Sequence, residues 1–535
     1  MLKVLTVAQI RQIEADADAA GVSYAELMER AGRAIAERAI VLLADRPQPK
    51  VTILVGTGNN GGDGLVAGRW LAQMQSDALV RYYVLSGRAD PDPVLQAAQD
   101  AGLFIANAAD DRDRRLLRNM VASADLVIDA IFGIGARLPL TDEASKVVRG
   151  TRQALNERAA AMRDRYTTLD PAATDQTEHP PKTLVLAVDC PSGLDCDTGK
   201  LDANALIADE TITFIGAKPG LLLFPGAGAV GRLRVAKLDL PEGIALLDQA
   251  QHTLLDADTA RAALPARPVD GHKGTFGRAI IVAGSAQYSG AAALAAQAAY
   301  RSGAGLVTVA SPPSVIGVLA AGLHEPTWLP LSDDYAALRQ ALGNCEALLF
   351  GPGVGQSTEA MTLLQEILKS EALPPMVIDA DGLTLLGDIG NRWQSLPDMT
   401  ILTPHPGEMA RLCNIDTAAV QANRPALALE KAAEWKVIVI LKGAHTLIAT
   451  PDGKLTYSPF KTDALATAGT GDVLAGVIAG LLAQGAAPDR AAVLGVYLQG
   501  LAGVLAAQTM GSTRSVIAGD VLRSLPAALA LLAKS

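Results

Sequence analysis

The sequence is poor in cysteine, histidine and aromatic residues. Its 535 residues include 4 cysteines and 6 histidines, and aromatic residues make up 4% of the chain. The four cysteines show neither paired metal-ligand spacing nor the density of a disulfide scaffold. They are Cys190, Cys196, Cys345 and Cys413. We therefore expect a protein of the reducing cytoplasm.

Blocks of positive charge and a leader segment are also lacking. Acidic residues outnumber lysine and arginine by 56 to 46, for a net charge of −10. Such a chain is a poor candidate for binding nucleic acid or an anionic membrane. Lys3 and Glu14 break up the N-terminus, so no signal-peptide apolar region is expected. The longest apolar runs, near 472–485 and 491–507, are interrupted by polar residues and are expected to be core helices, too short and too polar to span a bilayer.

Glycine and apolar residues are abundant. The chain has 50 glycines, and half of its residues are hydrophobic. Apolar runs alternate with helical patterns in both halves, which predicts α/β domains with parallel sheets covered on both faces. Strands are predicted at 51–55, 80–85, 126–132, 183–188 and 211–214, and then at 278–283, 305–310, 347–350, 376–379, 400–402 and 437–441. Helices are predicted at 7–43, at 65–75 and in three segments from 471 to 532.

Two stretches interrupt this alternation. Residues 164–182 are polar and rich in proline, threonine and aspartate, which favours a flexible insertion. Residues 239–256 contain a Leu-Pro-Glu-Gly turn that closes the first series. We predict one domain over residues 1–240, a linker over 241–255 and a second domain over 256–535.

A glycine-rich segment, residues 56–64, follows the first predicted strand. A strand, a glycine-rich turn and a helix place backbone N–H groups at a helix N-terminus, where phosphates bind. The spacing of Gly56, Gly58 and Gly61 also matches the dinucleotide fingerprint. That fingerprint expects a carboxylate at the end of the next strand, and residues 85–88 contain none. A hydride-transfer domain is therefore disfavoured, and a ligand-free tight turn is the alternative.

Two further strand ends of the first half carry aspartates, Asp129 and Asp189. Ligands of parallel sheets bind outside the carboxyl ends of the strands, so both are expected near the glycine-rich segment. Oxygen atoms of Asn60, Asp129 and Ser192 are candidate ligands of a monovalent cation. Capping of the following helices is the alternative for each aspartate.

Three motifs of the first half resemble the epimerase of hydrated NADH and NADPH. They are residues 26–32, 56–64 and 188–193. The resemblance covers residues 1–240 and implies that Asp189 is the acid/base and that Asn60, Asp129 and Ser192 bind potassium. It implies that the hydrated cofactor is held by Asn59, Asn60, Gly61, Gly62, Asp63, Gly133, Ile134, Gly135, Ala136, Arg137, Leu138, Pro139 and Asp189.

In the second half, residues 469–472 read Gly-Thr-Gly-Asp and open a helix. Successive N–H groups at a helix start form an anion hole. Phosphoryl transfer needs positioning, electrostatic stabilisation and a base for the attacking hydroxyl, and Asp472 is placed to be that base. A glycine turn with Asp472 as a helix cap is the alternative.

Other strand ends of the second half supply matching groups. Residues 442–446, 403–408 and 351–355 each follow a predicted strand. A histidine such as His405 is usually structural, but the Pro-His-Pro turn presents it rigidly. Asp379 and Asp381 are further candidates, although helix capping explains them nearly as well.

These motifs resemble the ribokinase-like superfamily and, within it, the ADP- or ATP-dependent dehydratase of hydrated NADH and NADPH. Residues 272–277, 284–291 and 302–307 add to the resemblance, which covers residues 256–535. It implies that Ala291, Gly353, His405 and Asp472 contact the hydrated dinucleotide. It implies that Lys442, Gly443, Ala444, His445, Thr446 and Gly471 contact the adenine nucleotide, with Mg²⁺ accompanying the phosphates.

The resemblance thus implies a Rossmann-like αβα domain followed by a ribokinase-like αβα domain. Together they would repair hydrated NADH and NADPH by epimerising the C6 hydrates and dehydrating the S form, with ADP favoured over ATP. We expect small-molecule substrates, no nucleic acid, no membrane and a homo-oligomer. One alternative is a vitamin or sugar kinase, and another makes the first half a non-catalytic binding module.

Overall fold

The computed structural model describes residues 1–89, 91–161, 182–332, 334–370 and 373–534, which form two compact units, Leu2–Ala250 and Gln251–Ser535. The insertion expected over residues 164–182 lies outside the described residues, apart from Lys182.

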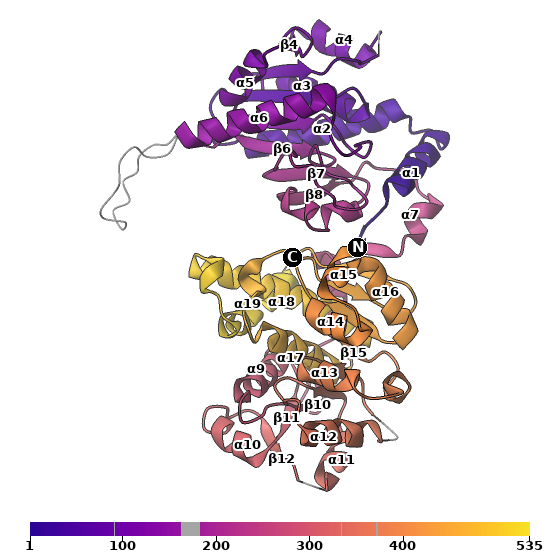
Figure 1. The fold of residues 1–535 in the computed structure, drawn as a ribbon, viewed down its shortest axis with the longest axis vertical. Helices are drawn as coiled ribbons and strands as arrows, with labels where there is room; N and C mark the ends of the chain where they lie inside the picture. Colours follow the sequence, from indigo (N-terminus) through magenta and orange to yellow (C-terminus); the bar gives the residue numbers. More distant parts are fainter. Residues whose placement is uncertain (90, 162–181, 333, 371–372, 535) are drawn as a thin grey trace, which may run out of the picture. The chain divides into compact units, whose positions relative to one another are not determined.

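The first unit is built on a parallel sheet with the strand order β4-β3-β2-β5-β6-β7-β8 (Figure 1). Its strands are β2 (Lys50–Val55), β3 (Leu79–Val84), β4 (Phe104–Asn107), β5 (Leu126–Ala130), β6 (Leu184–Val188), β7 (Glu210–Phe214) and β8 (Arg232–Ala236). Short strand β1 (Leu2–Lys3) precedes them. The central β2 pairs with β3 and β5, and Leu54 lies beside Asp129. The five predicted strands of this half are confirmed, while β4 and β8 had no predicted counterpart.

Helices cover both faces of this sheet. They are α1 (Val7–Ala19), α2 (Tyr24–Leu42), α3 (Asn59–Met74), α4 (Pro93–Asp100), α5 (Arg115–Ala122), α6 (Asp142–Ala161) and α7 (Ala245–Gln249). Ile53 and Val55 pack in one hydrophobic cluster with α1, α2 and α3. Leu54, on the opposite face of the same strand, packs with α5 and α6. Strands buried on both faces explain the continuous apolar runs of the sequence.

The second unit is built on a mixed sheet in which β9-β18-β17-β16-β15-β14-β13-β10-β11-β12 are neighbours in that order. Its strands are β9 (His252–Leu254), β10 (Arg278–Val282), β11 (Leu306–Ser311), β12 (Thr327–Pro330), β13 (Ala347–Phe350), β14 (Met376–Ile378), β15 (Ile401–Leu402), β16 (Ile438–Leu441), β17 (Leu447–Ala449) and β18 (Leu455–Tyr457). Strand β17 is antiparallel to β16 and β18, and the other pairs are parallel. The six predicted strands are confirmed, and the sequence pattern missed β9, β12, β17 and β18.

The helices of the second unit are α8 (Ala257–Ala262), α9 (Ser289–Arg301), α10 (Pro313–Leu319), α11 (Ala336–Leu342), α12 (Thr358–Leu368), α13 (Asp381–Gly387), α14 (Pro406–Cys413), α15 (Thr417–Ala422), α16 (Arg424–Trp435), α17 (Thr470–Ala483), α18 (Pro488–Met510) and α19 (Ala518–Lys534). Helices α9, α17, α18 and α19 share one hydrophobic cluster with Ile281, Ile438 and Ile440 of the sheet. Phe350 and Ile378 are also fully buried. Helix α17 can approach α9 closely because Gly476 has no side chain. A Cβ at this position would come within 2.2 Å of the Ala295 carbonyl oxygen.

The expectation that the apolar run at 491–507 is too short and too polar to span a bilayer is corrected by the structure. The run belongs to α18, whose 23 residues are long and apolar enough to cross a membrane by length and composition alone. Its most apolar window is 56% buried within the protein, where α18 packs between neighbouring helices. A core helix satisfies the same criteria of length and composition.

The predicted linker, residues 241–255, contains regular structure. Helix α7 packs Leu246 and Leu247 against the core of the first unit. Strand β9 pairs with β18, so residues 252–254 belong to the sheet of the second unit.

Candidate active sites

Helix α17 begins directly after Gly469, which has a φ of 90°. This left-handed conformation favours glycine, and a Cβ there would also lie 2.7 Å from Leu294 Cδ1. Within the described ranges, no side chain caps the N-terminus of this helix. Residues 468–472 line a cavity of about 380 Å³. The N–H groups of the first turn and the helix dipole therefore favour an anion in this cavity.

Buried polar side chains hold this turn in place. Thr470 Oγ1 donates hydrogen bonds to the carbonyl oxygens of Leu465 (2.8 Å) and Thr467 (2.9 Å). Gln499 Nε2 donates to the Thr470 carbonyl oxygen (2.7 Å), and Gln499 is only 8% exposed. An amide buried in the apolar α18 thus fixes the start of α17.

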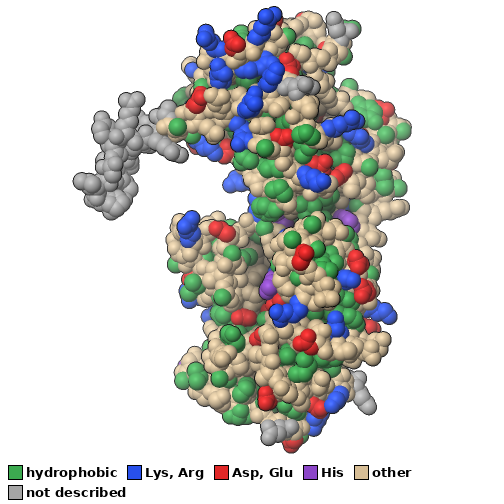
Figure 2. Space-filling view, viewed as in Figure 1, with side chains coloured by type: hydrophobic (Ala, Val, Ile, Leu, Met, Phe, Trp, Pro, Cys, Tyr) green, Lys and Arg blue, Asp and Glu red, His purple; other side chains and the backbone are tan. Residues whose placement is uncertain are grey.

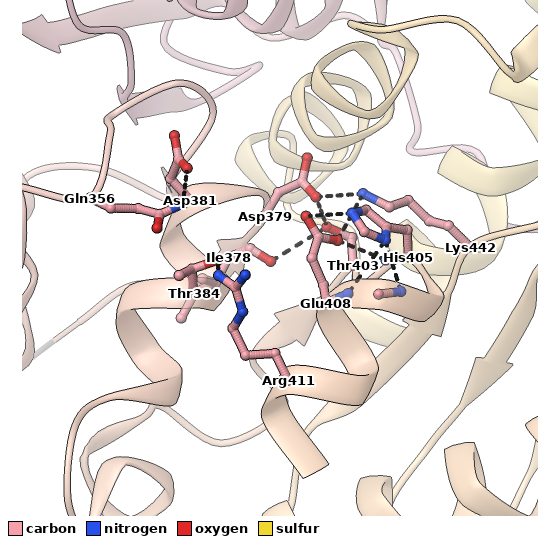
Figure 3. A network of polar contacts seen from close by, with 11 residues as sticks. Gln356, Ile378, Asp379, Asp381, Thr384, Thr403, His405, Glu408, Arg411 and Lys442 are labelled. Carbon is pink, nitrogen blue, oxygen red and sulfur yellow. Dashed lines mark hydrogen bonds and ion pairs between the residues drawn. The ribbon is translucent and has the colours of Figure 1, made fainter. Parts of the chain in front are cut away.

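Lys442 stands among carboxylates at the carboxyl edge of the sheet (Figure 3). It follows β16, and its Nζ donates to Asp379 Oδ1 at 2.8 Å and lies 3.7 Å from Glu408 Oε2. Thr403, after β15, donates to the same Asp379 oxygen at 2.7 Å. Burial lowers the pKa of Lys442, but the charges of Asp379, Glu408 and Asp472 outweigh it and raise the pKa. Lys442 therefore stays protonated and presents a positive charge to the cavity.

The pKa of Asp472 lies near neutral pH. Burial raises its pKa, and the charges of Asp379, Asp381 and Glu408 raise it further against the opposing effect of Lys442, to about 7. A carboxyl group with this pKa accepts and releases protons at neutral pH. Asp472 is thus suited to general base catalysis.

His405 is held at the N-terminus of α14 by a reciprocal capping arrangement. Its Nδ1 accepts from the backbone N–H groups of Gly407 (3.0 Å) and Glu408 (3.3 Å). Glu408 Oε2 in turn accepts from the His405 backbone N–H at 2.7 Å. Because Nδ1 is an acceptor, Nε2 carries the hydrogen when the ring is neutral. Nε2 lies 3.5 Å from Glu408 Oε1, so Glu408 contacts both ends of His405.

A second cavity of about 470 Å³ adjoins the first. Ala380, His405 and Asp472 line both cavities. The backbone of Ala380 has φ 53° and ψ −124°, a strained conformation for alanine of the kind that concentrates at functional sites. Two ligands bound in the two cavities would meet at Asp472.

Most of the residues expected in the second site line these cavities. Ala291, Gly353, His405 and Asp472 line the larger cavity. Lys442, Gly443, Ala444, Thr446 and Gly471 line the smaller one. His445 does not line either cavity: its side chain is 5% exposed, and its Nδ1 lies 2.8 Å from the Ser458 carbonyl oxygen. Burial lowers the pKa of His445 to about 4, so its ring is neutral, which disfavours a direct role in phosphate binding.

Residues 59–63 of the first unit are the first turn of α3, where a loop was expected. Gly58 precedes the helix without a side-chain cap, so the N–H groups of this turn are available. Arg88, after β3, donates to the Gly56 carbonyl oxygen at 2.6 Å and pairs with Asp92. The arginine thus supports the glycine-rich segment from the next strand.

Asp189 lies at the end of β6 with a φ of 65°. Lys218 Nζ and Thr213 Oγ1 donate to its Oδ1, and the Ile134 N–H donates to its Oδ2 at 3.2 Å. Lys218 is 1% exposed and also donates to Thr213 Oγ1 at 2.6 Å. One carboxylate oxygen is therefore bound to the lysine, and the other faces residues 133–134.

Two more carboxyl groups, Asp63 and Glu14, surround Asp189. Burial raises the pKa of Asp63 well above its ordinary value, and the charges of Asp189 and Glu14 add to the rise. Burial and the charge of Asp189 likewise raise the pKa of Glu14. The cluster thus combines a carboxylate paired with Lys218 and carboxyl groups that hold protons more readily.

Asp129 and Ser192 form a buried pair next to this cluster. The Ser192 Oγ and backbone N–H donate to the two carboxylate oxygens at 2.6 and 2.7 Å. Asp129 is fully buried and has no ion pair within the described part of the chain, and burial raises its pKa to about 6. Asn60 is 9% exposed, and its Nδ2 is buried without a hydrogen-bond partner among the described residues. Its Oδ1 and Asp189 Oδ2 both face Gly133.

Only the first residues of the segment 133–139 contact the cluster around Asp189. Gly133 and Ile134 contact the cluster. Leu138 packs with the hydrophobic cluster of α5 and α6, and Arg137 is exposed.

Sequence reasoning missed Lys218, Glu14 and Gln499. A lysine within the Gly-Ala-Lys-Pro-Gly segment after β7 is a signal that was available for Lys218. Nothing local distinguishes Glu14 from other helical glutamates, since only the fold brings α1 to the end of β6. A glutamine inside an apolar helix is the signal for Gln499.

Two αβα units with acid and base groups at the carboxyl edges of their parallel strands define a two-domain α/β enzyme. Residues 279–526 match the family described as NAD(P)H-hydrate dehydratase, and residues 24–220 match the family described as YjeF-related protein N-terminus.

Similar proteins cover almost the whole chain. The bifunctional NAD(P)H-hydrate repair enzyme of Moorella thermoacetica is 37% identical over 89% of this chain and 87% of its own length. That of Thermofilum pendens is 34% identical over 99% of this chain and 97% of its own. A crystal structure of the ADP/ATP-dependent NAD(P)H-hydrate dehydratase from Bacillus subtilis, co-crystallised with ATP and Mg²⁺, is 32% identical over 52% of this chain and 98% of its own, with a TM-score of 0.47. The chain belongs to the family of bifunctional NAD(P)H-hydrate repair enzymes, and the expected fold class is confirmed.

The pKa of Asp472 predicts how the nucleotide-dependent reaction depends on pH. Because the base must be ionised to accept a proton, kcat/KM should rise as the pH increases through about 7 and then level off. Glu408→Gln removes a negative charge that raises this pKa, so the midpoint should move to lower pH. A profile that is flat or falls across neutral pH would contradict the assignment.

Proposed function

We propose that the second unit phosphorylates the C6 hydroxyl of (S)-NAD(P)H hydrate and then eliminates the phosphate to restore the dihydronicotinamide. The observation that carries this proposal is the position of Asp472, at the uncapped start of α17 and on the wall shared by the two cavities. The nucleotide would occupy the smaller cavity, and the hydrated dinucleotide the larger one.

The geometry supports the first step. Asp472 takes the proton of the C6 hydroxyl while the hydroxyl oxygen attacks the terminal phosphorus of the nucleotide. Lys442 and the first-turn N–H groups of α17 stabilise the negative charge of the transferring group. The bond from phosphorus to the nucleotide breaks, and the shortened nucleotide leaves.

The second step removes the phosphate. Hydroxide is a poor leaving group, whereas phosphate is a good one. The lone pair of ring nitrogen N1 expels it from C6, and loss of the C5 proton restores the C5=C6 double bond. His405, which borders both cavities, is placed to contact the nicotinamide ring and orient it.

Mg²⁺ is proposed to enter with the nucleotide phosphates. Within the described ranges, no group of three or more histidine, cysteine, aspartate or glutamate side chains is arranged to hold a metal ion. A Mg²⁺ ion that is bound mainly through phosphates needs few protein ligands, and it would neutralise part of the phosphate charge. We propose ADP as the phosphate donor.

We further propose that the first unit interconverts the C6 epimers, with Asp189 as the acid/base. The protein is proposed to act in the cytoplasm. The epimerase role is supported by the arrangement of Asp189, Asp63 and Glu14 beside Lys218, because epimerisation at a carbon bearing hydroxyl and nitrogen requires protons to be removed and returned. The buried Asp129 carboxylate has no positive partner in the part of the chain the structure describes, which fits a monovalent cation held by Asp129, Ser192 and Asn60. Such a cation supplies positive charge beside the substrate.

Hydrated NADH tests the repair activity directly. With an equimolar mixture of both C6 epimers, Mg²⁺ and ADP, the wild-type protein should restore the ultraviolet absorbance of the whole mixture. No recovery with either ADP or ATP would refute the proposal. Accumulation of a stable phosphate ester of a vitamin or sugar would instead support the kinase alternative.

Asp189→Asn tests the role of the first unit. The variant should convert the S epimer at the wild-type rate and then stop, apart from slow spontaneous epimerisation, because only the second unit remains active. Asp100→Asn, an exposed change at the end of α4, is the matched control and should behave as wild type. Complete conversion by Asp189→Asn at the wild-type rate would make the first unit a non-catalytic module.

A further inference from the structure

The larger cavity of the second unit is lined almost entirely by acidic and uncharged side chains. Its carboxyl groups belong to Asp381, Glu408 and Asp472. Among the described residues that line it, the single side chain with a permanent positive charge is that of Arg411. Lys442 lines the smaller cavity, where it is bound to Asp379.

This distribution of charge constrains how a dinucleotide can lie in the cavity. The pyrophosphate that links the two nucleosides of NADHX and NADPHX is an anion. Placing it beside Asp381, Glu408 or Asp472 would bring like charges together in a partly buried site, which is unfavourable. The nicotinamide end must reach Asp472, so the pyrophosphate must lie elsewhere along the cavity wall.

Arg411 is positioned to receive it. Glu408 and Arg411 are three residues apart on α14 and therefore lie on the same face of the helix. Arg411 lies on the other side of Glu408 from Lys442 (Figure 3). Its Nη1 donates to Thr384 Oγ1 of α13 at 3.0 Å. Among the described side chains, Thr384 is the one hydrogen-bond partner of Arg411, and Arg411 is exposed.

We propose that Arg411 binds the pyrophosphate shared by NADHX and NADPHX. The inference rests on the proposed function of the second unit. The hydrogen bond to Thr384 orients the guanidinium group and leaves its other N–H donors for the phosphate oxygens, to which arginine binds in a bidentate manner. Arg411 is thus a substrate-positioning residue that takes no part in proton or phosphoryl transfer.

Steady-state dehydration by Arg411→Gln tests this assignment. Loss of a charged hydrogen bond to phosphate should raise KM for both hydrated NADH and hydrated NADPH by about 10- to 100-fold, with kcat changed much less. The KM for ADP should not change. The hydrate of dihydronicotinamide riboside, which has no phosphate, should react equally well with variant and wild type. Arg411→Lys should restore part of the affinity.

A control variant and a second test variant separate this role from a general loss of structure. Arg301→Gln removes an exposed arginine from the last turn of α9 and should leave every KM unchanged. Thr384→Val keeps the arginine but removes its orienting hydroxyl, and should raise KM for the dinucleotides about threefold. An unchanged KM in Arg411→Gln, or an equal rise for the riboside, would overturn the proposal. A rise confined to hydrated NADPH would also overturn it, because the contact would then be to the 2′-phosphate.

Binding of NADH itself, followed by its fluorescence, separates this proposal from the proposed reaction. NADH carries the same pyrophosphate but needs no turnover. If Arg411→Gln weakens NADH binding about tenfold and Arg301→Gln does not, the subsite stands even where no dehydration is detected. Equal binding by both variants would contradict it.

Discussion

The charge of Lys442 is the constraint on which the second site depends. Its ammonium group balances Asp379 and Glu408, and its field opposes the rise in the pKa of Asp472. Without a cation at this position, several carboxyl groups would face one another in a partly buried space, and some of them would be protonated at neutral pH. Lys442 thus keeps Asp379 and Glu408 in place while leaving Asp472 near the pKa that a general base needs. The same charge is available to the phosphates of a nucleotide.

The first unit contains a related arrangement on a different sheet. Lys218 is fully buried and holds one oxygen of Asp189, while Asp63 and Glu14 hold their protons more tightly. In both units, a single lysine after a buried strand pairs with one of several neighbouring carboxyl groups. The space-filling view shows that charged side chains of both signs are interspersed over the visible surface (Figure 2).

Much of this was predictable from the sequence, because the decisive groups follow apolar strands. Asp129, Asp189, His405 and Lys442 were each identified as polar residues at the end of a buried run, and a parallel sheet brings such ends to one edge. The Gly-Thr-Gly-Asp segment was identified by a different signal, the successive N–H groups at the start of a predicted helix. The boundaries of the sheets were harder, since short strands such as β12 and β17 have three or four residues and depend on pairing with neighbours.

Side-chain direction and distant contacts were not predictable. His445 was grouped with its neighbours in the predicted nucleotide site, yet its φ of 50° and its contact with Ser458 turn it into the core. Lys218 and Glu14 reach Asp189 only through the packing of α1 and the segment after β7. The role of Gln499 depends on α18 crossing the start of α17, which no local pattern reveals.

Asp472 is proposed to activate a hydroxyl whose phosphorylation expels water from a damaged cofactor. This proposal is tested most directly by measuring inorganic phosphate and regenerated NADH together, from the S hydrate and ADP, with the wild type and Asp472→Asn. One phosphate should be released for each NADH regained, and both should fall by about a hundredfold or more in the variant. Phosphate released without NADH, a phosphate ester that is retained, or an Asp472→Asn variant as active as wild type would contradict it.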